Sequence, residues 1–162
     1  MQDYGSLRSG EASLAHVDEK GQADVTDVSG KKLLPRVGRA EGFITMPAEL
    51  IDRITSVKGG NIYEIARLAG IMGTKKTPDI IPLCYALNLD NASLEFTQER
   101  ENGRVRAFAE VRCHTRAGVE MEALTAVSAA LLTLYLIGMG VAREESIKIT
   151  DVAIVRDAGD EK

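Results

Sequence analysis

The spacing of apolar side chains changes along the chain, and each change indicates a new structural element. Apolar residues recur three and four positions apart over 47–58 and again over 61–76, which predicts two helices. Asn61 is expected to cap the second helix, because its side-chain oxygen can accept a hydrogen bond from a free backbone N–H of the first turn. Glu64 stands three residues later, as in a capping box.

Strands are predicted where apolar and polar residues alternate. Residues 94–99 and 105–113 alternate in this way, and Asn102-Gly103 between them is a dipeptide typical of hairpin turns. A short apolar strand is expected at Gly42–Met46 and a closing strand at Ile147–Val155. Alternation places apolar side chains on one face of a sheet and polar ones on the other, which is typical of antiparallel sheets.

Finer details of the chain are also predicted. Short strands are expected near Ala23–Val28, and Thr77-Pro78 is expected to cap and begin a short helical turn. The small residues of the second helix indicate close packing against another element. The apolar stripe of that helix consists of Ile62, Ile65, Ala66, Ala69 and Met72.

The longest apolar stretch runs over 118–141 and is long enough to raise the question of a membrane span. Thr125, Ser128, Thr133 and two glycines interrupt it, so we interpret it as the buried helix of a globular protein and expect no membrane partner.

This order of elements favours an α+β fold, in which helices pack on one face of an antiparallel sheet. We expect a disordered tail over 1–12, a single domain over 13–157 and a short C-terminal tail over 158–162. Neither an internal repeat nor an interdomain linker is visible in the sequence.

Composition excludes several classes of protein. The chain has 162 residues and a net charge of −4, which excludes a bulk-charge nucleic-acid binder. The two cysteines, Cys84 and Cys113, are too few for a disulfide framework, so a reduced, cytoplasmic protein is expected. No basic start followed by an apolar stretch indicates a secretory signal.

The charge is unevenly distributed. Residues 31–76 hold nine basic and four acidic side chains, a local charge of +5, whereas the rest of the chain carries −9. A basic segment in an acidic protein suits a small polyanionic ligand, although solvated helix faces would give the same pattern.

The sequence argues against several kinds of chemistry. Cys113 and His114 are adjacent on a predicted strand and point to opposite faces, so they cannot bind one metal ion, and no zinc-type spacing occurs. No nucleophile elbow or Walker loop is present. Lys58-Gly59-Gly60-Asn61 leads into a helix N-terminus, which could bind an anion or simply break a helix.

Two polar clusters are the remaining candidates for a site. Glu120 and Glu122 open the apolar helix, where they interact well with the helix dipole or could bind the amide and amine edge of a heterocycle. Lys75 and Lys76 end the preceding helix, where they could be dipole partners or could bind a phosphate.

Several blocks of sequence resemble a known family. Leu14–Asp18, Asp27–Lys31, Arg39–Gly42, Ala66–Ile71, Ile81–Cys84 and Gly118–Ala126 occur in the order found in the cyclic pyranopterin monophosphate synthases, the C proteins of molybdenum cofactor biosynthesis. The block Gly-Val-Glu-Met-Glu-Ala-Leu-Thr-Ala is highly specific, and the resemblance covers about residues 13–157.

The resemblance implies a fold, a reaction and an assembly. The fold is ferredoxin-like, and the subunits form a hexamer as a trimer of dimers, with the active site at a dimer interface. The reaction converts 3′,8-cyclo-7,8-dihydroguanosine triphosphate to cyclic pyranopterin monophosphate and pyrophosphate, and no cofactor is expected. The implied substrate-binding residues are Leu83, Cys84, Tyr85, Glu120, Met121 and Glu122, with Lys75 as a further lysine of the site and Lys58 as a second catalytic candidate.

The chain departs from the family pattern at several catalytic positions. Leu136 stands at the position of the family's catalytic aspartate, Met139 at that of a catalytic lysine, and Tyr85 at that of a histidine. Lys58 lies one residue before the position of a further lysine, which Gly59 occupies. Leucine cannot exchange a proton and methionine cannot carry positive charge.

Three hypotheses follow from these departures. The chain is a synthase with an altered residue set, a catalytically inactive relative that binds a nucleotide-like ligand or regulates a partner, or a homologue that acts on another nucleotide-like substrate. The second hypothesis includes mixed oligomers with an active homologue.

Overall fold

The fold was analysed in a computed structural model, which describes residues 15–56, 61–140 and 146–156. The strands are β1 (Leu34–Thr45), β2 (Asn91–Glu99), β3 (Arg104–Thr115) and β4 (Lys148–Ile154), and the helices are α1 (Ala48–Ser56), α2 (Ile62–Lys75), α3 (Thr77–Ile80) and α4 (Glu120–Met139). The elements along the described chain therefore follow the order β-α-β-β-α-β, with α1 to α3 between the first two strands.

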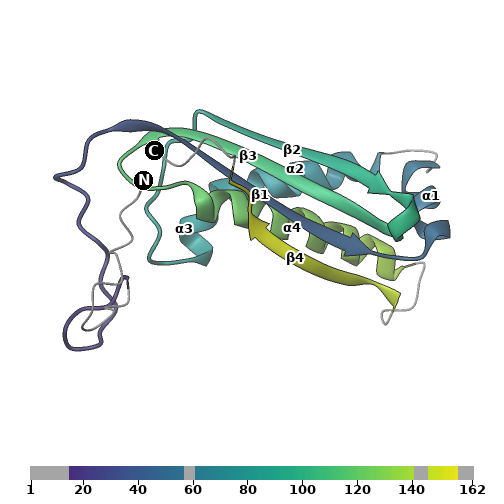
Figure 1. Cartoon of the computed structure of the whole chain (residues 1–162), viewed down its shortest axis with the longest axis horizontal. Helices are drawn as coiled ribbons and strands as arrows, with labels where there is room; N and C mark the ends of the chain where they lie inside the picture. The colour runs from purple at the N-terminus through teal and green to yellow at the C-terminus, as the bar shows by residue number, and fades with distance from the viewer. Residues whose placement is uncertain (1–14, 57–60, 141–145, 157–162) are drawn as a thin grey trace.

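The four strands form one open sheet in the order β2-β3-β1-β4, and all three pairings are antiparallel. Both long helices cover the same face of this sheet (Figure 1). This arrangement is the split β-α-β connectivity of ferredoxin-like folds. The expected α+β class, with helices packed on one face of an antiparallel sheet, is confirmed.

The core lies between the sheet and α4. The inward side chains of β3 are all buried, and those of α4 pack against them: Val105, Ala107, Ala109, Val111, Ala123, Val127, Leu131 and Leu134. Burial of these apolar side chains is the main stabilising contribution of the fold, at about 25 cal/mol for each Å² removed from water.

Small residues hold α2 close to α4, as the sequence indicates. A Cβ atom added at Gly70 would lie 2.6 Å from Leu94 Cδ1 and 2.8 Å from the carbonyl oxygen of Ala126. One added at Gly73 would lie 2.9 Å from Ala129 Cβ. Figure 1 shows the two helices running antiparallel, and the Cβ atom added at Gly73 would also lie 3.3 Å from the carbonyl oxygen of Thr125, so the end of α2 lies beside the start of α4.

Only part of the predicted apolar stripe of α2 faces the core: Ala66 is buried, as predicted, and Ile62 is partly buried against the core. Ile65 and Met72 are exposed, and the buried positions are Ala66, Gly70 and Thr74. The close approach of α4 explains the difference, because only small side chains fit between the two helices. The Asn61 cap is confirmed, since its side-chain oxygen accepts a 3.0 Å hydrogen bond from the backbone N–H of Tyr63.

Other local predictions need correction. No strand forms at 23–28, where the described chain has only an isolated bridge between Val17 and Ala23. The strand expected at 42–46 is the last part of β1, which begins at Leu34. Thr77 is the first residue of α3 and not its cap; its hydroxyl donates to the carbonyl oxygen of Thr74 at 3.0 Å.

The predicted hairpin of β2 and β3 is confirmed, but its turn is longer than Asn102-Gly103. Glu99 pairs with Arg104, and a 3-10 turn over Arg100–Asn102 connects the strands. Gly103 has a φ of 60°, a left-handed conformation that glycine adopts without steric cost. The dipeptide therefore marks the place of the reversal, and its glycine supplies the unusual backbone geometry.

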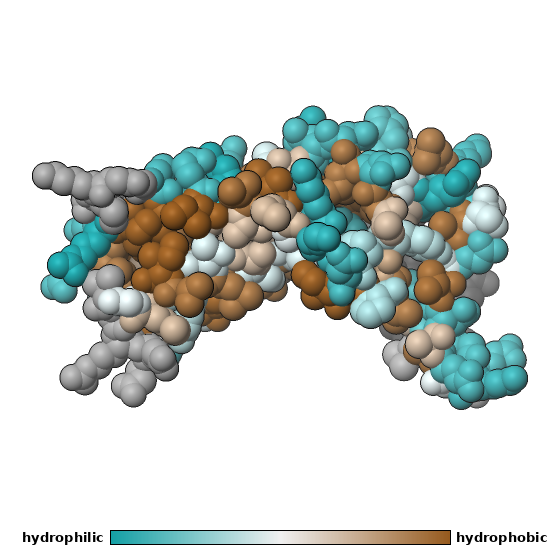
Figure 2. All heavy atoms as spheres, turned by 180° about the vertical axis from the view of Figure 1, so that it is seen from behind, coloured by the Kyte–Doolittle hydropathy of each residue, from teal (hydrophilic) through white to brown (hydrophobic). Residues whose placement is uncertain are grey.

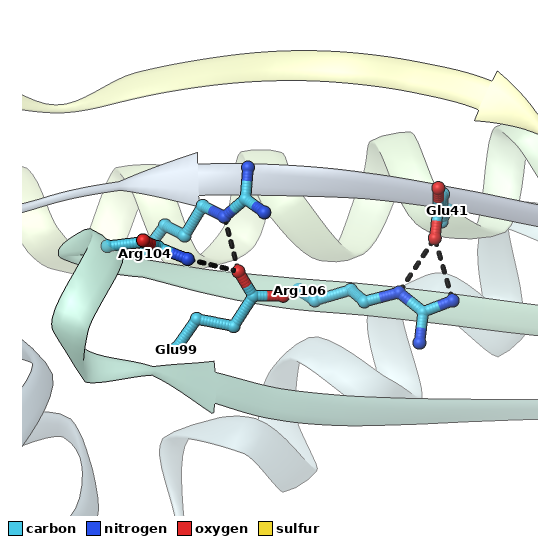
Figure 3. A network of polar contacts seen from close by, with 5 residues as sticks. Glu41, Glu99, Arg104 and Arg106 are labelled. Carbon is cyan, nitrogen blue, oxygen red and sulfur yellow. Dashed lines mark hydrogen bonds and ion pairs between the residues drawn. The ribbon is translucent and has the colours of Figure 1, made fainter.

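The other face of the sheet carries charged side chains that pair with one another. Glu41 on β1 binds Arg106 on β3 at 2.7 Å, and Glu99 on β2 binds Arg104 at 2.5 Å (Figure 3). Arg104 also lies 4.0 Å from the centre of the Phe43 ring. This polar face confirms that the alternating pattern of β3 separates a buried face from an open one.

Judged by length and composition alone, helix α4 could cross a membrane. In the fold it packs on β1, β3 and α2, as expected of a core helix. Its outer side, however, is exposed at Leu132, Leu136 and Met139, and Ile65 of the neighbouring α2 is exposed as well. Figure 2 shows the helix side of the molecule, with apolar side chains gathered over this layer.

Candidate functional site

The first turn of α4 places a carboxyl group inside the protein. Glu122 is only 3% exposed, and burial raises its pKa above the ordinary value of 4.5. The carboxylate of Glu120 raises the pKa of Glu122 further, while a hydrogen bond from its own backbone N–H lowers it in part. A buried carboxyl of this kind can accept hydrogen bonds from the N–H groups of a ligand, which would replace the lost water.

Both cysteines lie close enough to Glu122 for its charge to affect them. Burial raises the pKa of the Cys84 thiol, and the Glu122 carboxylate raises it further. The pKa of Cys113 is raised by burial, by Asp90 and by Glu122. Thiols with raised pKa values stay protonated at neutral pH, so neither cysteine is suited to nucleophilic chemistry.

Backbone contacts fix these side chains. The Cys113 thiol donates to the carbonyl oxygen of Asn88 at 3.1 Å. Asp90 accepts hydrogen bonds from the backbone N–H of His114 at 2.8 Å and binds its Nδ1 at 2.7 Å. The segment 84–90 is thereby attached to the end of β3, which holds Cys84 beside the start of α4.

Tyr85 points toward the N-terminal part of the chain. Its hydroxyl donates a hydrogen bond to the carbonyl oxygen of Thr26. The hydroxyl is therefore engaged by the protein itself in this structure, whereas the side chain of its neighbour Cys84 lies near Glu122.

Lys75 lies at the same end of the helix layer as Glu122. It is the last residue of α2, and the antiparallel packing of α2 on α4 brings this end beside the α4 N-terminus. Its side chain is exposed, whereas the next lysine, Lys76, forms a 3.1 Å ion pair with Asp79. Of the two lysines, Lys75 is the one whose ammonium group has no ion-pair or hydrogen-bond partner within the part of the chain that the structure describes, so it can meet an anionic ligand.

The remaining predicted residues divide into two groups. Glu120 and Met121 lie in the same helical turn as Glu122, and Leu83 directly precedes Cys84. Leu136 and Met139 lie near the other end of α4, and Leu136 is 67% exposed. Fourteen residues separate Leu136 from Glu122, about 21 Å along the helix axis. Lys58 lies outside the described residues.

Arg36 is a site candidate that sequence reasoning missed. It lies on β1 directly opposite Cys113, and its Nε atom is buried without a hydrogen-bond partner among the described residues. In an alternating strand Arg36 has the same parity as Gly38 and Ala40, both buried. This parity was the available signal, but the sequence predicted a strand only from Gly42 onward.

Gly38 explains how β1 positions the start of α4. A Cβ atom there would lie 2.5 Å from the carbonyl oxygen of Val119, the residue that precedes α4. The same carbonyl oxygen accepts the 3.2 Å hydrogen bond from Ala123 that closes the first helical turn. The absence of a side chain at Gly38 thus allows the turn carrying Glu122 to sit directly on β1.

Metal binding was tested on the described side chains. Among residues 15–56, 61–140 and 146–156, no group of three or more histidine, cysteine or acidic side chains could hold a metal ion. The side chains near the α4 N-terminus offer a buried carboxyl, two protonated thiols, an exposed lysine and a guanidinium nitrogen without a hydrogen-bond partner among the described residues.

These groups belong to an α+β domain whose candidate site lies at one end of the sheet, around Glu122, Cys84 and the end of α2. Comparison with known proteins identifies the family. The MoaC family matches residues 25–160, and the chain belongs to it.

Relatives from several bacteria support this assignment. A protein of Desulforapulum autotrophicum is 45% identical over 75% of this chain and 76% of its own length, and one of Magnetococcus marinus is 46% identical over 76% and 77%. A protein of Dinoroseobacter shibae is 41% identical over 91% of this chain and 94% of its own. All three are named cyclic pyranopterin monophosphate synthase.

Proposed function

We propose that this protein acts in molybdenum cofactor biosynthesis on 3′,8-cyclo-7,8-dihydroguanosine triphosphate, with cyclic pyranopterin monophosphate and pyrophosphate as products. The observation that carries the proposal is the buried carboxyl of Glu122 beside Cys84, within a sequence block that resembles the synthases. Relatives up to 46% identical bear the name of that synthase.

The charges around Glu122 suit such a substrate. A guanine-derived ring presents adjacent N–H donors, and a buried carboxylate that accepts them replaces its lost hydration. Lys75 and Arg36 are the cations that would meet the phosphates, since one is exposed at the end of α2 and the other has a buried unpaired Nε. The other substrate-contacting residues we propose are Leu83, Cys84, Tyr85, Glu120 and Met121.

We further propose that the protein is an oligomer, a hexamer arranged as a trimer of dimers. Two observations support an interface on the helix side. Ile65, Leu68 and Met72 are exposed on α2, and Leu132 and Leu136 are exposed on the neighbouring α4; exposed apolar patches are typical of interaction sites. The positions of Glu122 and Leu136 are also too far apart to share a site within one chain.

The domain is proposed to span residues 13–157, between a tail over 1–12 and a tail over 158–162, and the protein is proposed to be cytoplasmic. The two free cysteines, one buried and one half-buried, are consistent with a reducing compartment.

A second candidate function is ligand binding without turnover. Leu136 and Met139 favour it, because neither can transfer a proton or carry charge, and Tyr85 uses its hydroxyl to bind Thr26. Under this alternative the protein binds the nucleotide or regulates an active homologue in a mixed oligomer.

A single-turnover experiment separates the two functions. The purified protein is incubated with 3′,8-cyclo-7,8-dihydroguanosine triphosphate, and pyrophosphate release and pterin fluorescence after oxidation are followed. Product formation supports the synthase. Binding by calorimetry without product supports the second candidate. Absence of both product and binding contradicts the synthase and the nucleotide-binding form of the second candidate, and leaves regulation of a partner protein.

A gain-of-function variant sharpens the test. The triple variant Tyr85→His, Leu136→Asp, Met139→Lys places the residue types of the resembled family at all three positions. If the wild type binds without turnover, product formation by this variant would attribute the missing step to these side chains. Glu122→Gln is the matched loss-of-binding variant, since it keeps the shape of the side chain but replaces one acceptor oxygen by a donor.

A further inference from the structure

The arginines of this protein differ in whether a carboxylate holds them. Figure 3 shows two arginines of the open sheet face bound to glutamates, and four on this face are bound in this way: Arg39, Arg104, Arg106 and Arg112. Arg116, in the turn between β3 and α4, has no carboxylate partner among residues 15–56, 61–140 and 146–156. Its charge is therefore available to an anion.

A backbone contact fixes the Arg116 guanidinium. Its Nε donates a 3.1 Å hydrogen bond to the carbonyl oxygen of Lys31, and its two terminal nitrogens donate to no group in the described part of the chain. A guanidinium presents its N–H groups as a planar fork that matches the oxygens of a phosphate. The contact with Lys31 thus orients this fork before a ligand binds.

Two lysines accompany Arg116. The hydrogen bond to its carbonyl oxygen places Lys31 next to Arg116, and Lys32 follows in the chain. Both lysines are exposed, and neither forms an ion pair with a described residue. The nearest acid before them in the sequence, Asp27, accepts the backbone N–H of Ser29 at 2.8 Å. Three uncompensated cations close together attract anions.

These cations lie at the end of the sheet where α4 begins. Leu34 pairs with Thr115, so the chain before β1 and the chain after β3 leave the sheet together. The start of α4 packs on β1 at Gly38, where an added Cβ atom would lie 2.5 Å from the carbonyl oxygen of Val119. Leu34 and Gly38 are about 14 Å apart along the strand. The three cations are therefore near the turn that carries Glu122 but separate from it.

We propose that Arg116, Lys31 and Lys32 form a binding site for linked phosphate groups. The terminal N–H groups of Arg116 donate to the oxygens of one phosphate, and the two lysines neutralise the remaining charge. The phosphates belong either to free pyrophosphate or to a nucleotide whose ring lies at Glu122. Only the second source rests on the proposed function.

Calorimetry with inorganic pyrophosphate at low ionic strength tests the site. Arg116→Ala should weaken binding about ten- to hundredfold, the range for hydrogen bonds to a charged group. Added salt should weaken binding to the wild type, because it screens exposed charges. Arg112→Ala is the matched control and should leave the affinity unchanged, since Arg112 lies four residues earlier on β3 and is held by Glu110.

A second variant keeps the proposal testable if Arg116→Ala does not fold. Lys31→Ala removes one cation but keeps the backbone carbonyl that orients Arg116. It should weaken pyrophosphate binding about two- to fivefold, as for the loss of an exposed ion pair. Its Tm should equal that of the wild type.

The results decide whether the site exists. Weaker binding in Arg116→Ala and in Lys31→Ala, with Arg112→Ala unchanged, supports it. A wild type that does not bind pyrophosphate overturns the proposal, as does unchanged binding in folded Arg116→Ala. An equal loss in Arg112→Ala also overturns it, because binding would then follow the overall charge.

Competition identifies the source of the phosphates. If pyrophosphate displaces 3′,8-cyclo-7,8-dihydroguanosine triphosphate from the wild type, the nucleotide's phosphates use the site; if both bind independently, the site takes free pyrophosphate. Either result keeps the site. Glu122→Gln should weaken nucleotide binding and leave pyrophosphate binding unchanged, so failure of the proposed function and failure of this site give different results.

Discussion

Replacing Gly38 with alanine should destabilise the protein through the backbone contact between β1 and α4. The new Cβ atom would lie 2.5 Å from the carbonyl oxygen and 2.8 Å from the carbonyl carbon of Val119. A backbone carbonyl that already accepts the N–H of Ala123 cannot turn aside as a flexible side chain would. Forcing extra volume into a close-packed site costs about 1–3 kcal/mol.

The entropy of the unfolded chain acts in the opposite direction. Glycine-to-alanine changes stabilise by about 0.4–1 kcal/mol where the backbone tolerates them. The net expectation for Gly38→Ala is therefore a loss of about 1–2 kcal/mol, or roughly 2–8 °C in Tm for a chain of this size. Because the first turn of α4 must shift, binding at Glu122 should weaken as well.

Urea denaturation at fixed protein concentration, followed by circular dichroism, measures the change. Gly30→Ala is the matched control, since a Cβ atom there has no neighbour within 4 Å. The control should stay within about 0.5 kcal/mol of the wild type. If Gly38→Ala unfolds at the same urea concentration as Gly30→Ala, the contact with Val119 does not constrain the fold and the reasoning is refuted.

Three further predictions concern charge. Burial raises the folded-state pKa of Glu122, so the wild type should lose stability as pH rises from about 4.5 through that pKa. The loss should be about 1.36 kcal/mol for each unit by which the folded-state pKa exceeds 4.5. Glu122→Gln should remove this loss, and equal pH profiles of the two proteins in thermal melts would contradict the prediction. Alkylation of Cys84 at pH 7 should be slower than that of a free thiol, because burial and then the Glu122 carboxylate raise its pKa, and it should be faster in Glu122→Gln, which removes the second cause. A rate unchanged by the substitution, measured by mass spectrometry, would show that the carboxylate does not act on the thiol. Arg106→Ala should cost about 1 kcal/mol, since it removes the ion pair with Glu41 on the open sheet face, and high salt should reduce the difference in denaturation experiments.

The fold brings together only some of the site residues that the family resemblance implies. The sequence block around Glu122 identifies the family, and the structure brings Cys84 and the end of α2 to the same place. The order of residues in the sequence could not separate Leu136 from this group. Their separation in space is known only once the structure shows that both Glu122 and Leu136 lie on one continuous helix, α4.

Local sequence signals determined the elements of this protein because their causes are local. The alternation over 105–113 produced β3, the Asn61 side chain capped α2, and the long apolar run became α4. These features follow from backbone hydrogen bonding and side-chain periodicity, which neighbouring residues establish among themselves.

Only the tertiary structure decided which surfaces these elements bury. The apolar pattern of α2 favoured Ile65, Ala66 and Met72 together. The approach of α4 buried Ala66 and Gly70 and left the larger Ile65 and Met72 exposed. Likewise, Arg36 became a site candidate only once β1 paired with β3 and placed it opposite Cys113. Packing distance and strand register depend on residues far apart in the chain, so no local pattern contains them.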